Sequence, residues 1–257
     1  MDWAKAFYTK TGGWWVKADA AVSPRDLDRV SIVRTHAGGG PSRILELGAG
    51  YGTTMVVLAE AGYQVTGIEL SDRADAVGDI PCAHPSNITM IKGDFFEAQP
   101  PGPFDLVCYW NGFGIGADAD QRRLLARIAR EWLAPGGAAL VDIFNPFVWS
   151  RWDGDEDHLL PDPEQGYDHE LRQSTRFDPM TSTAIDTWWD CQDPTRKITQ
   201  YLRCYSPSDL TLLLEGTGLS LSTIRIAGQD IGRMAPADAA ALLKDHHEYL
   251  AVLMHDR

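Results

Sequence analysis

Residues 43–72, RILELGAGYGTTMVVLAEAGYQVTGIELSD, carry a cluster of glycines with acidic residues on either side of it. An apolar run, 43–47, leads into a turn with three glycines, and Glu69 lies near the end of a second apolar run, 64–70. Glycine lets the backbone approach a ligand closely, and the helix start after the turn offers free N–H groups. An acid at the tip of the next strand can bind a ribose. The spacing predicts a strand–turn–helix–strand unit that binds the adenosine part of a cofactor.

The residues around the turn indicate which nucleoside is bound. The pattern is Glu46-x-Gly48-x-Gly50-x-Gly52, whereas the dinucleotide fingerprint G-x-G-x-x-G would need a glycine where Thr53 stands. A carboxylate beside the turn attracts the ammonium and sulfonium groups of S-adenosylmethionine and repels a pyrophosphate. The pattern therefore favours S-adenosylmethionine, and an NAD-dependent oxidoreductase is an alternative.

Three segments, ILELGAGYG, GIEL and KGDFFE, resemble motifs of the class I S-adenosylmethionine-dependent methyltransferases, and the resemblance covers roughly residues 40–145. It implies an α/β fold with a Rossmann-like sheet in the strand order 3-2-1-4-5-7-6. It also implies that Glu46 and the turn hold the methionine end, Glu69 the ribose, and Asp94 with Phe95 the adenine. The predicted cofactor contacts are Glu46, Gly48, Ala49, Gly50, Glu69, Leu70, Asp94, Phe95 and Trp110.

A further apolar run, 104–110, ends in the residues NGFG at 111–114. In the class I fold the end of this strand lies beside the reactive methyl group. Amino-methyltransferases that act on nucleic-acid bases carry an N/D-P-P-Y/F motif there, and this chain has no proline at that place. The segment WNGFG instead resembles small-molecule methyltransferases, including those for sugar or antibiotic amines. Asn111 and Phe113 are therefore predicted to contact the acceptor.

Five aromatic residues fall within residues 2–17, before the core begins. They suit a lid that excludes water and faces the sulfonium with aromatic rings. Tyr8, Trp14 and Trp15 are the predicted substrate contacts of this lid. The alternative is that the aromatic residues only attach the N-terminal segment to the core.

Residues 145–205 extend beyond a minimal methyltransferase core. A polar loop, 150–166, precedes three stretches of alternating residues, 168–178, 181–190 and 195–205. β-Branched and aromatic residues dominate these stretches, which predicts an antiparallel sheet inserted after the fifth strand. Such a sheet would cover the cofactor and form a wall of the acceptor pocket.

Methyl transfer requires alignment of the acceptor with the methyl group and removal of any proton on the acceptor. His169, with Glu170 beside it, is the candidate catalytic base, and solvated side chains on an exposed strand are the alternative. Trp188 and Trp189 point to opposite faces of their strand. Trp188 is predicted to line the pocket.

The chain divides into four predicted segments: a lid and helix over 1–40, the cofactor-binding core over 41–144, the insertion over 145–205, and the end of the core over 206–257. Within them, one helix is expected over 24–37, where the run at 38–41 ends it, and another over 121–133.

The composition limits the partners and the compartment. With 23 basic and 36 acidic side chains the net charge is −13, which argues against a nucleic-acid partner. No apolar stretch approaches the ~20 residues that span a bilayer, and the first residues lack the pattern of a signal peptide. Four scattered cysteines without a C-x-x-C pair favour a cytoplasmic protein with reduced thiols.

No metal is expected from the sequence. Asp153, Asp155, Asp157 and Glu164 have calcium-loop spacing, but His158 replaces the glycine that such a loop needs. The run Asp245-His246-His247-Glu248 directs its histidines to opposite sides of the chain.

Taken together, these features predict a methyltransferase that moves a methyl group from S-adenosylmethionine to a small molecule. The acceptor is expected to be an amine or hydroxyl of a specialised metabolite, as in antibiotic biosynthesis. A small-molecule C-methyltransferase and a non-catalytic S-adenosylmethionine-binding protein are the further alternatives. The sequence leaves the oligomeric state open, a homo-oligomer included.

Overall fold

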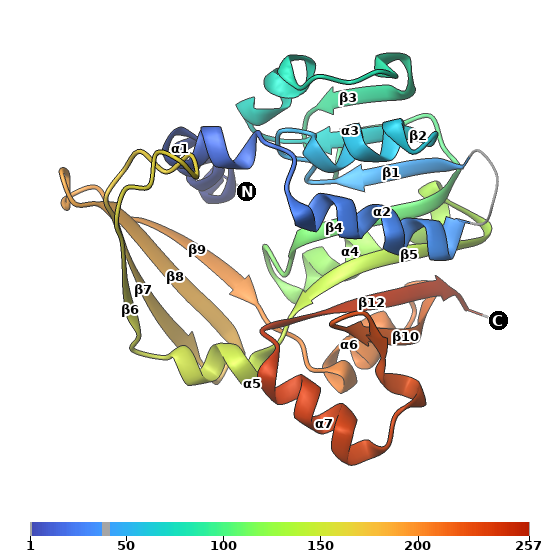
Figure 1. Ribbon diagram of the computed structural model, residues 1–257. Helices are drawn as coiled ribbons and strands as arrows, with labels where there is room; N and C mark the ends of the chain where they lie inside the picture. Colours follow the sequence, from blue (N-terminus) through green and yellow to red (C-terminus); the bar gives the residue numbers. More distant parts are fainter. Residues whose placement is uncertain (1, 38–41, 257) are drawn as a thin grey trace.

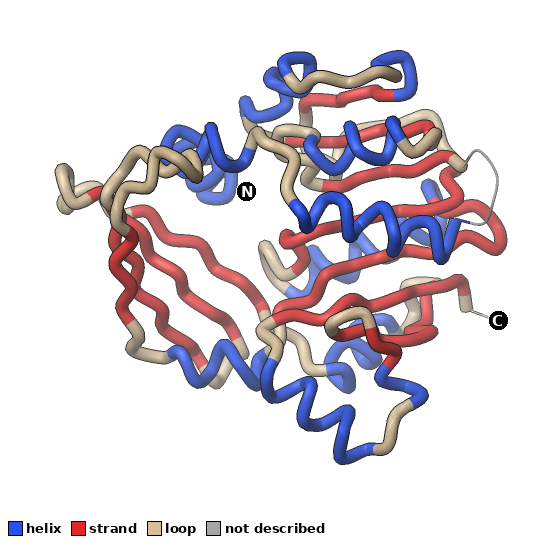
Figure 2. The backbone as a smooth tube through the Cα atoms, in the orientation of Figure 1, coloured by secondary structure: helices blue, strands red, loops and turns tan. Residues whose placement is uncertain are grey.

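The computed structural model describes residues 2–37 and 42–256, so the predicted break at 38–41 lies outside the described residues. Two sheets organise this part of the chain, a central one of eight strands and a separate one of four (Figures 1 and 2). No helix within it is long and apolar enough to cross a membrane.

The central sheet has the strand order β11-β10-β12-β5-β4-β1-β2-β3. Its strands are β1 (Arg43–Leu47), β2 (Gln64–Glu69), β3 (Ile88–Lys92), β4 (Phe104–Phe113), β5 (Leu133–Phe144), β10 (Leu219–Ile226), β11 (Gln229–Asp230) and β12 (Glu248–His255). The strands from β3 to β5 are parallel, and β12 is antiparallel to both of its neighbours. With β12 as the seventh strand and β10 as the sixth, the predicted class I order is confirmed, and the short edge strand β11 is an addition to it.

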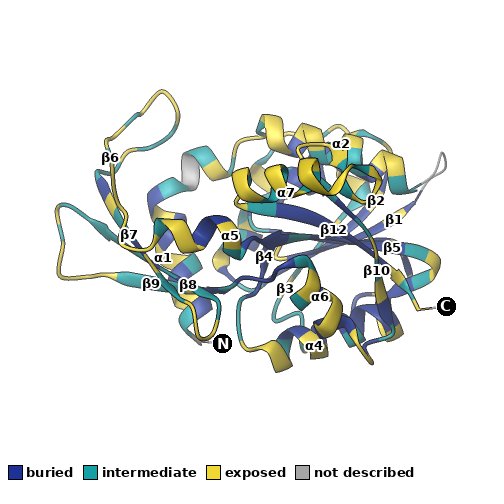
Figure 3. Ribbon diagram, turned by 90° about the horizontal axis from the view of Figure 1, so that it is seen from below, coloured by how far each residue is buried: buried dark blue, intermediate teal, exposed yellow. Residues whose placement is uncertain are grey.

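Helices cover both faces of the central sheet and bury its strands (Figure 3). On one face lie α2 (Pro24–Ala37) and α3 (Thr53–Glu60), and on the other α4 (Asp118–Arg127) and α6 (Pro207–Leu214). The helix predicted over 121–133 is α4 followed by a π-helical turn, Ile128–Trp132. A 3₁₀ helix, Asp72–Asp79, follows β2, and α5 (Pro146–Trp149) packs beside α7 (Pro236–Asp245).

The insertion after β5 forms the second sheet, which is antiparallel as predicted. It consists of β6 (Glu156–Leu159), β7 (Leu171–Asp178), β8 (Thr183–Asp190) and β9 (Ile198–Arg203). The expectation of a loop over 150–166 was wrong at β6, which pairs with β7 along its whole length. Three of the four residues of β6 are exposed and the last is half-buried, so this strand has no buried face. Its sequence, EDHL, therefore lacks the apolar alternation that would predict a strand.

The aromatic N-terminal segment forms helix α1 (Asp2–Asp19), which lies between the insertion sheet and the core (Figure 1). The ring of Trp3 packs edge-on against Tyr201 at 5.5 Å, and that of Trp15 against Trp188 at 5.0 Å. These contacts attach α1 to strands β8 and β9 of the insertion.

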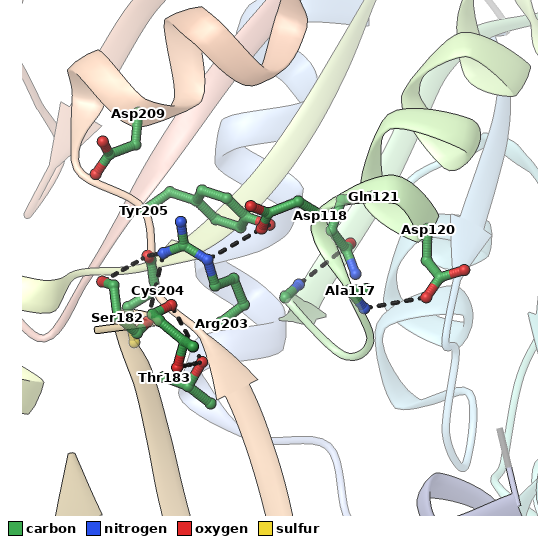
Figure 4. A network of polar contacts seen from close by, with 12 residues as sticks. Ala117, Asp118, Asp120, Gln121, Ser182, Thr183, Arg203, Cys204, Tyr205 and Asp209 are labelled. Carbon is green, nitrogen blue, oxygen red and sulfur yellow. Dashed lines mark hydrogen bonds and ion pairs between the residues drawn. The ribbon is translucent and has the colours of Figure 1, made fainter. Parts of the chain in front are cut away.

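The insertion returns to the core where β9 meets the end of β4 (Figure 4). The backbone N–H of Arg203 donates to the carbonyl oxygen of Gly114 at 2.9 Å, and its Nε donates to Asp118 Oδ1 at 3.0 Å. The hydroxyl of Tyr205 donates to the same carboxylate oxygen at 2.7 Å. Asp118, the first residue of α4, thus links this helix to the end of β9.

Candidate active site

A cavity of about 300 Å³ lies where the carboxyl ends of β1, β2 and β4 meet. All nine predicted cofactor contacts line it: Glu46, Gly48, Ala49, Gly50, Glu69, Leu70, Asp94, Phe95 and Trp110. Parallel strands bring their carboxyl ends to one edge of a sheet, so the fold gathers residues from distant parts of the sequence. We call this hollow the cofactor cavity.

Glu69 ends β2 and holds the glycine turn in place. Its Oε2 accepts a hydrogen bond from the N–H of Gly50 at 2.9 Å. Its Oε1 accepts from the N–H of Ser71 at 2.8 Å and from the Ser71 hydroxyl at 2.6 Å. A carboxylate has about four acceptor positions, so Glu69 retains capacity for a ligand hydroxyl.

Four residues that line the cofactor cavity each have a buried polar atom without a protein partner. These atoms are Glu46 Oε2, Arg29 Nη2, Arg73 Nε and Trp110 Nε1. Unpaired buried polar groups are costly, so their position indicates a polar ligand with both donor and acceptor groups. The ammonium and carboxylate of the methionine end of S-adenosylmethionine meet that requirement.

Arg29 is held in place by α2 and α3. Its Nη1 donates to Thr54 Oγ1 at 2.8 Å and lies 3.4 Å from Asp26 Oδ1. Burial opposes the charged form of Asp26, but hydrogen bonds from Ser23 and Thr54, together with Arg29, lower its pKa. The guanidinium is therefore a fixed cation next to Glu46.

Arg29 was not among the residues predicted from the sequence. It lies three residues after the buried Asp26 and four before the buried Val33, and so faces the core. The charged pair Asp26 and Arg29, three residues apart on that face, was the signal available in the sequence.

Another part of the cofactor cavity is formed by Asp94 and aromatic rings. Asp94 Oδ1 accepts from the N–H of Phe96 at 2.8 Å. The ring of Phe95 packs edge-on against Tyr109 at 5.7 Å. All four residues line the cavity and offer a carboxylate oxygen and apolar surfaces to a flat heterocycle such as adenine.

A second cavity, of about 320 Å³, is lined by α1, the insertion and the core; we call it the acceptor cavity. It shares Tyr8, Asp19, Arg73 and Asn111 with the cofactor cavity. The remaining lining residues are mostly aromatic: Phe7, Trp15, Phe144, Trp149 and Trp188, with Thr11, Gln200 and Leu202. The structure thus brings together four of the predicted substrate contacts, namely Tyr8, Trp15, Asn111 and Trp188.

Two other predicted substrate contacts lie away from both cavities. Phe113 is 1% exposed, and its ring packs against Tyr109 and Tyr205 in the core, because β4 continues through this residue. Trp14 is also buried and borders a different surface hollow.

The predicted catalytic base, His169, and its neighbour Glu170 likewise lie outside the lining of both cavities. His169 Nδ1 lies 2.9 Å from Asp190 Oδ2, and Glu170 Oε1 lies 2.7 Å from His158 Nε2. His169 borders the same surface hollow as Trp14, on the side of α1 that carries Lys5 and Lys10. The position of these two residues does not support a role in proton removal.

Asn111 lies where the two cavities meet. Its backbone has a φ of 54°, which is costly for a residue other than glycine and is common at functional sites. Arg25 Nη2 donates to the side-chain oxygen of Asn111 at 2.6 Å, and the backbone N–H of Asn111 donates to the carboxylate of Asp142. Burial and the charge of Glu248 raise the pKa of Asp142 to about 7. These contacts hold Asn111 in its strained conformation.

Arg73 attaches α1 to the cofactor side of the core. Its guanidinium lies over the rings of Tyr8, at 5.6 Å, and Tyr51, at 5.2 Å. It also donates to Thr11 Oγ1 at 3.2 Å, and the Tyr51 hydroxyl donates to the carbonyl of Gly12 at 3.1 Å. Helix α1 is therefore fixed beside both cavities.

The sheet order, the glycine turn and the cavity at the strand ends define a class I S-adenosylmethionine-dependent methyltransferase. Residues 24–224 match the methyltransferase domain family, and the chain belongs to that family. No curated protein has a matching sequence.

Solved structures share the fold at low sequence identity. The CcbJ methyltransferase from Streptomyces caelestis is 19% identical, with a TM-score of 0.71, and the match covers 93% of this chain and 92% of that one. An S-adenosylmethionine-dependent methyltransferase from Clostridium acetobutylicum is 11% identical, with a TM-score of 0.70 and coverages of 99% and 100%. The sugar N-methyltransferase KedS8 from a Streptoalloteichus species is 19% identical, with a TM-score of 0.57 and coverages of 96% and 91%.

Proposed function

We propose that this methyltransferase binds S-adenosylmethionine in the cofactor cavity and methylates an amine of a small polar molecule bound in the acceptor cavity. The observation that carries the proposal is the set of four residues shared by the two cavities, Tyr8, Asp19, Arg73 and Asn111. Ligands in the two cavities would meet at these residues. The bound cofactor would supply an electrophilic methyl group on its sulfonium.

The chain's own residues would hold the cofactor through complementary charge. Glu46 would accept from its ammonium and Arg29 would donate to its carboxylate, which gives both unpaired buried groups a partner. Glu69 would accept from the ribose hydroxyls, and Asp94 with Phe95 would enclose the adenine. The protein would thus act by holding the two reactants in line and by excluding water.

The acceptor cavity suits an amine better than a neutral hydroxyl compound. Its aromatic walls, among them Trp15, Trp149 and Trp188, can contact the apolar face of a sugar-like ring and attract a cation. Asp19 adds a carboxylate where the two cavities meet. The fold shared with a sugar N-methyltransferase supports the same class of acceptor.

Matched pairs of acceptors test this proposal. The purified protein would be incubated with S-adenosylmethionine and either an amino sugar or the same sugar with a hydroxyl in place of the amine. We expect S-adenosylhomocysteine and a methylated product, measured by mass spectrometry, only with amines. Methylation of the hydroxyl partner alone would overturn the choice of an amine. Cofactor binding without turnover on any member of a broad panel would instead support a non-catalytic binding protein.

The acidity of Glu46 predicts a pH-dependent cofactor affinity. Burial raises its pKa to about 8, although the charge of Arg29 opposes this rise. Below that pH the side chain is mostly neutral, and an ammonium ligand must displace the proton. We expect the apparent Kd for S-adenosylhomocysteine to fall about tenfold per pH unit between pH 6 and 7 and to level off above pH 8. Calorimetry in buffers of different ionisation enthalpy would show the released proton, and Glu46→Gln should remove both effects.

Neighbouring tryptophans provide a matched test of the acceptor cavity. Trp188 lines it and packs against Trp15, whereas Trp189 points to the other face of β8 and lies under the ammonium of Lys197, 4.0 Å from its ring centre. We expect Trp188→Ala to lower kcat/KM about tenfold, mainly through KM, because about 1.4 kcal/mol of contact is lost. Trp189→Ala should leave kcat/KM within about twofold. Equal losses in both variants would contradict the proposed wall.

A further inference from the structure

Three metal-ligating side chains meet on the insertion sheet, away from both cavities. They are His158 in β6, Glu170 just before β7, and Cys191 just after β8. Among residues 2–37 and 42–256 this is the one group of three or more such side chains whose ligand atoms lie within 4.8 Å of one another.

Strand register explains why these residues meet. His158 pairs with Arg172 across β6 and β7, and Arg172 pairs with Trp189 across β7 and β8. Glu170 and Cys191 lie two residues from these positions, joined by a backbone hydrogen bond of 2.9 Å. Residues two apart on a strand share a face. The three ligands therefore lie on the face of Trp189, opposite the face on which Trp188 lines the acceptor cavity.

The side-chain atoms already converge as a zinc site would need. His158 Nε2 lies 2.7 Å from Glu170 Oε1, and Cys191 Sγ lies within 4.8 Å of both. With zinc bonds of about 2.0 Å to nitrogen and oxygen and 2.3 Å to sulfur, tetrahedral ligands stand about 3.3–3.7 Å apart. Small side-chain rotations would open the first pair and bring the sulfur closer. Cys191 is a free, half-buried thiol, so it is available as a ligand.

We propose that His158, Glu170 and Cys191 bind one Zn²⁺ ion. The set of one imidazole, one carboxylate and one thiolate matches the ligands that zinc takes in proteins, and the fourth position would hold a water molecule. The ion would join β6, β7 and the segment after β8, and so stiffen the sheet whose other face forms a wall of the acceptor cavity. No short sequence motif marks this site, because its three ligands come from segments that are separated in the chain.

Metal titration of the full-length, reduced protein tests the proposal. After chelator treatment and its removal, Co²⁺ would be added as a spectroscopic probe, and Zn²⁺ would be titrated against a chromophoric competitor. We expect one Co²⁺ per chain with a thiolate-to-cobalt charge-transfer band, which zinc displaces. Cys191→Ser should abolish this band and weaken Zn²⁺ binding about 100-fold, whereas Cys82→Ser, a matched half-buried cysteine outside the group, should retain both.

Thermal unfolding provides a second measurement that does not depend on cobalt. Saturating Zn²⁺ should raise the Tm of the wild type and of Cys82→Ser, because a ligand that binds only the folded state stabilises it. At a Zn²⁺ concentration that only just saturates the wild type, the Tm of Cys191→Ser and of His158→Gln should rise much less, because these variants bind the ion more weakly. Zinc affinity or a Tm rise that is equal in Cys191→Ser and the wild type would overturn the assignment, as would a cobalt spectrum without the charge-transfer band.

Discussion

Substitution of Glu69 by alanine is expected to weaken the binding of S-adenosylhomocysteine about 30-fold. The change removes a charged acceptor proposed to bind the ribose, a loss of about 2 kcal/mol, and it also leaves the N–H groups of Gly50 and Ser71 without their partner. Isothermal titration calorimetry at constant pH measures the affinity directly.

Two further variants separate the ligand contact from the support of the turn. Ser71→Ala removes the 2.6 Å hydrogen bond from its hydroxyl to Glu69 and the longer N-cap hydrogen bond, 3.4 Å, that the hydroxyl accepts from the N–H of Arg73, so it should change the affinity by less than about threefold. Glu97→Ala removes an exposed acid that does not line the cofactor cavity, and it should have no effect. Unchanged affinity in Glu69→Ala would refute the ribose role, and an equal loss in Ser71→Ala would show that only the turn matters.

Substitution of Gly114 by alanine is expected to lower the free energy of unfolding by about 3 kcal/mol. The backbone of Gly114 has a φ of 107°, and a Cβ placed there would lie 2.3 Å from the carbonyl oxygen of Arg203. Because that oxygen belongs to the backbone, the clash can be relieved only by moving β9 away from the end of β4. Urea denaturation followed by fluorescence and circular dichroism measures the loss.

Gly136→Ala is the matched control, since Gly136 has a φ of 82° but no atom lies within 4 Å of the added Cβ. It should lose only about 1 kcal/mol from the left-handed backbone. The difference between the two variants isolates the contact with Arg203. Equal destabilisation would show that Gly114 is needed only for its backbone conformation.

The sequence by itself determined the sheet order and the residues around the cofactor cavity. Glu46, the glycine turn and Glu69 fall within one strand–turn–helix–strand unit, where local spacing sets both the fold and the ligand contacts. Six of the nine predicted cofactor contacts belong to this unit, and the other three, Asp94, Phe95 and Trp110, lie after β3 and in β4; all nine line one cavity. The three longer strands of the insertion were also predicted, because their alternation reflects one buried face.

Only the tertiary structure decided which side chains from distant segments meet. Arg29 lies close enough to Glu46 for their charges to interact because α2 packs against α3, where Arg29 Nη1 donates to Thr54. A search for apolar periodicity does not find Arg29, because its inward-facing side chain is charged. Phe113 was drawn into the core because β4 extends beyond the predicted strand end. His169 lies outside the lining of both cavities because it precedes β7 and its Nδ1 lies 2.9 Å from Asp190 at the end of β8, a pairing that no local pattern specifies.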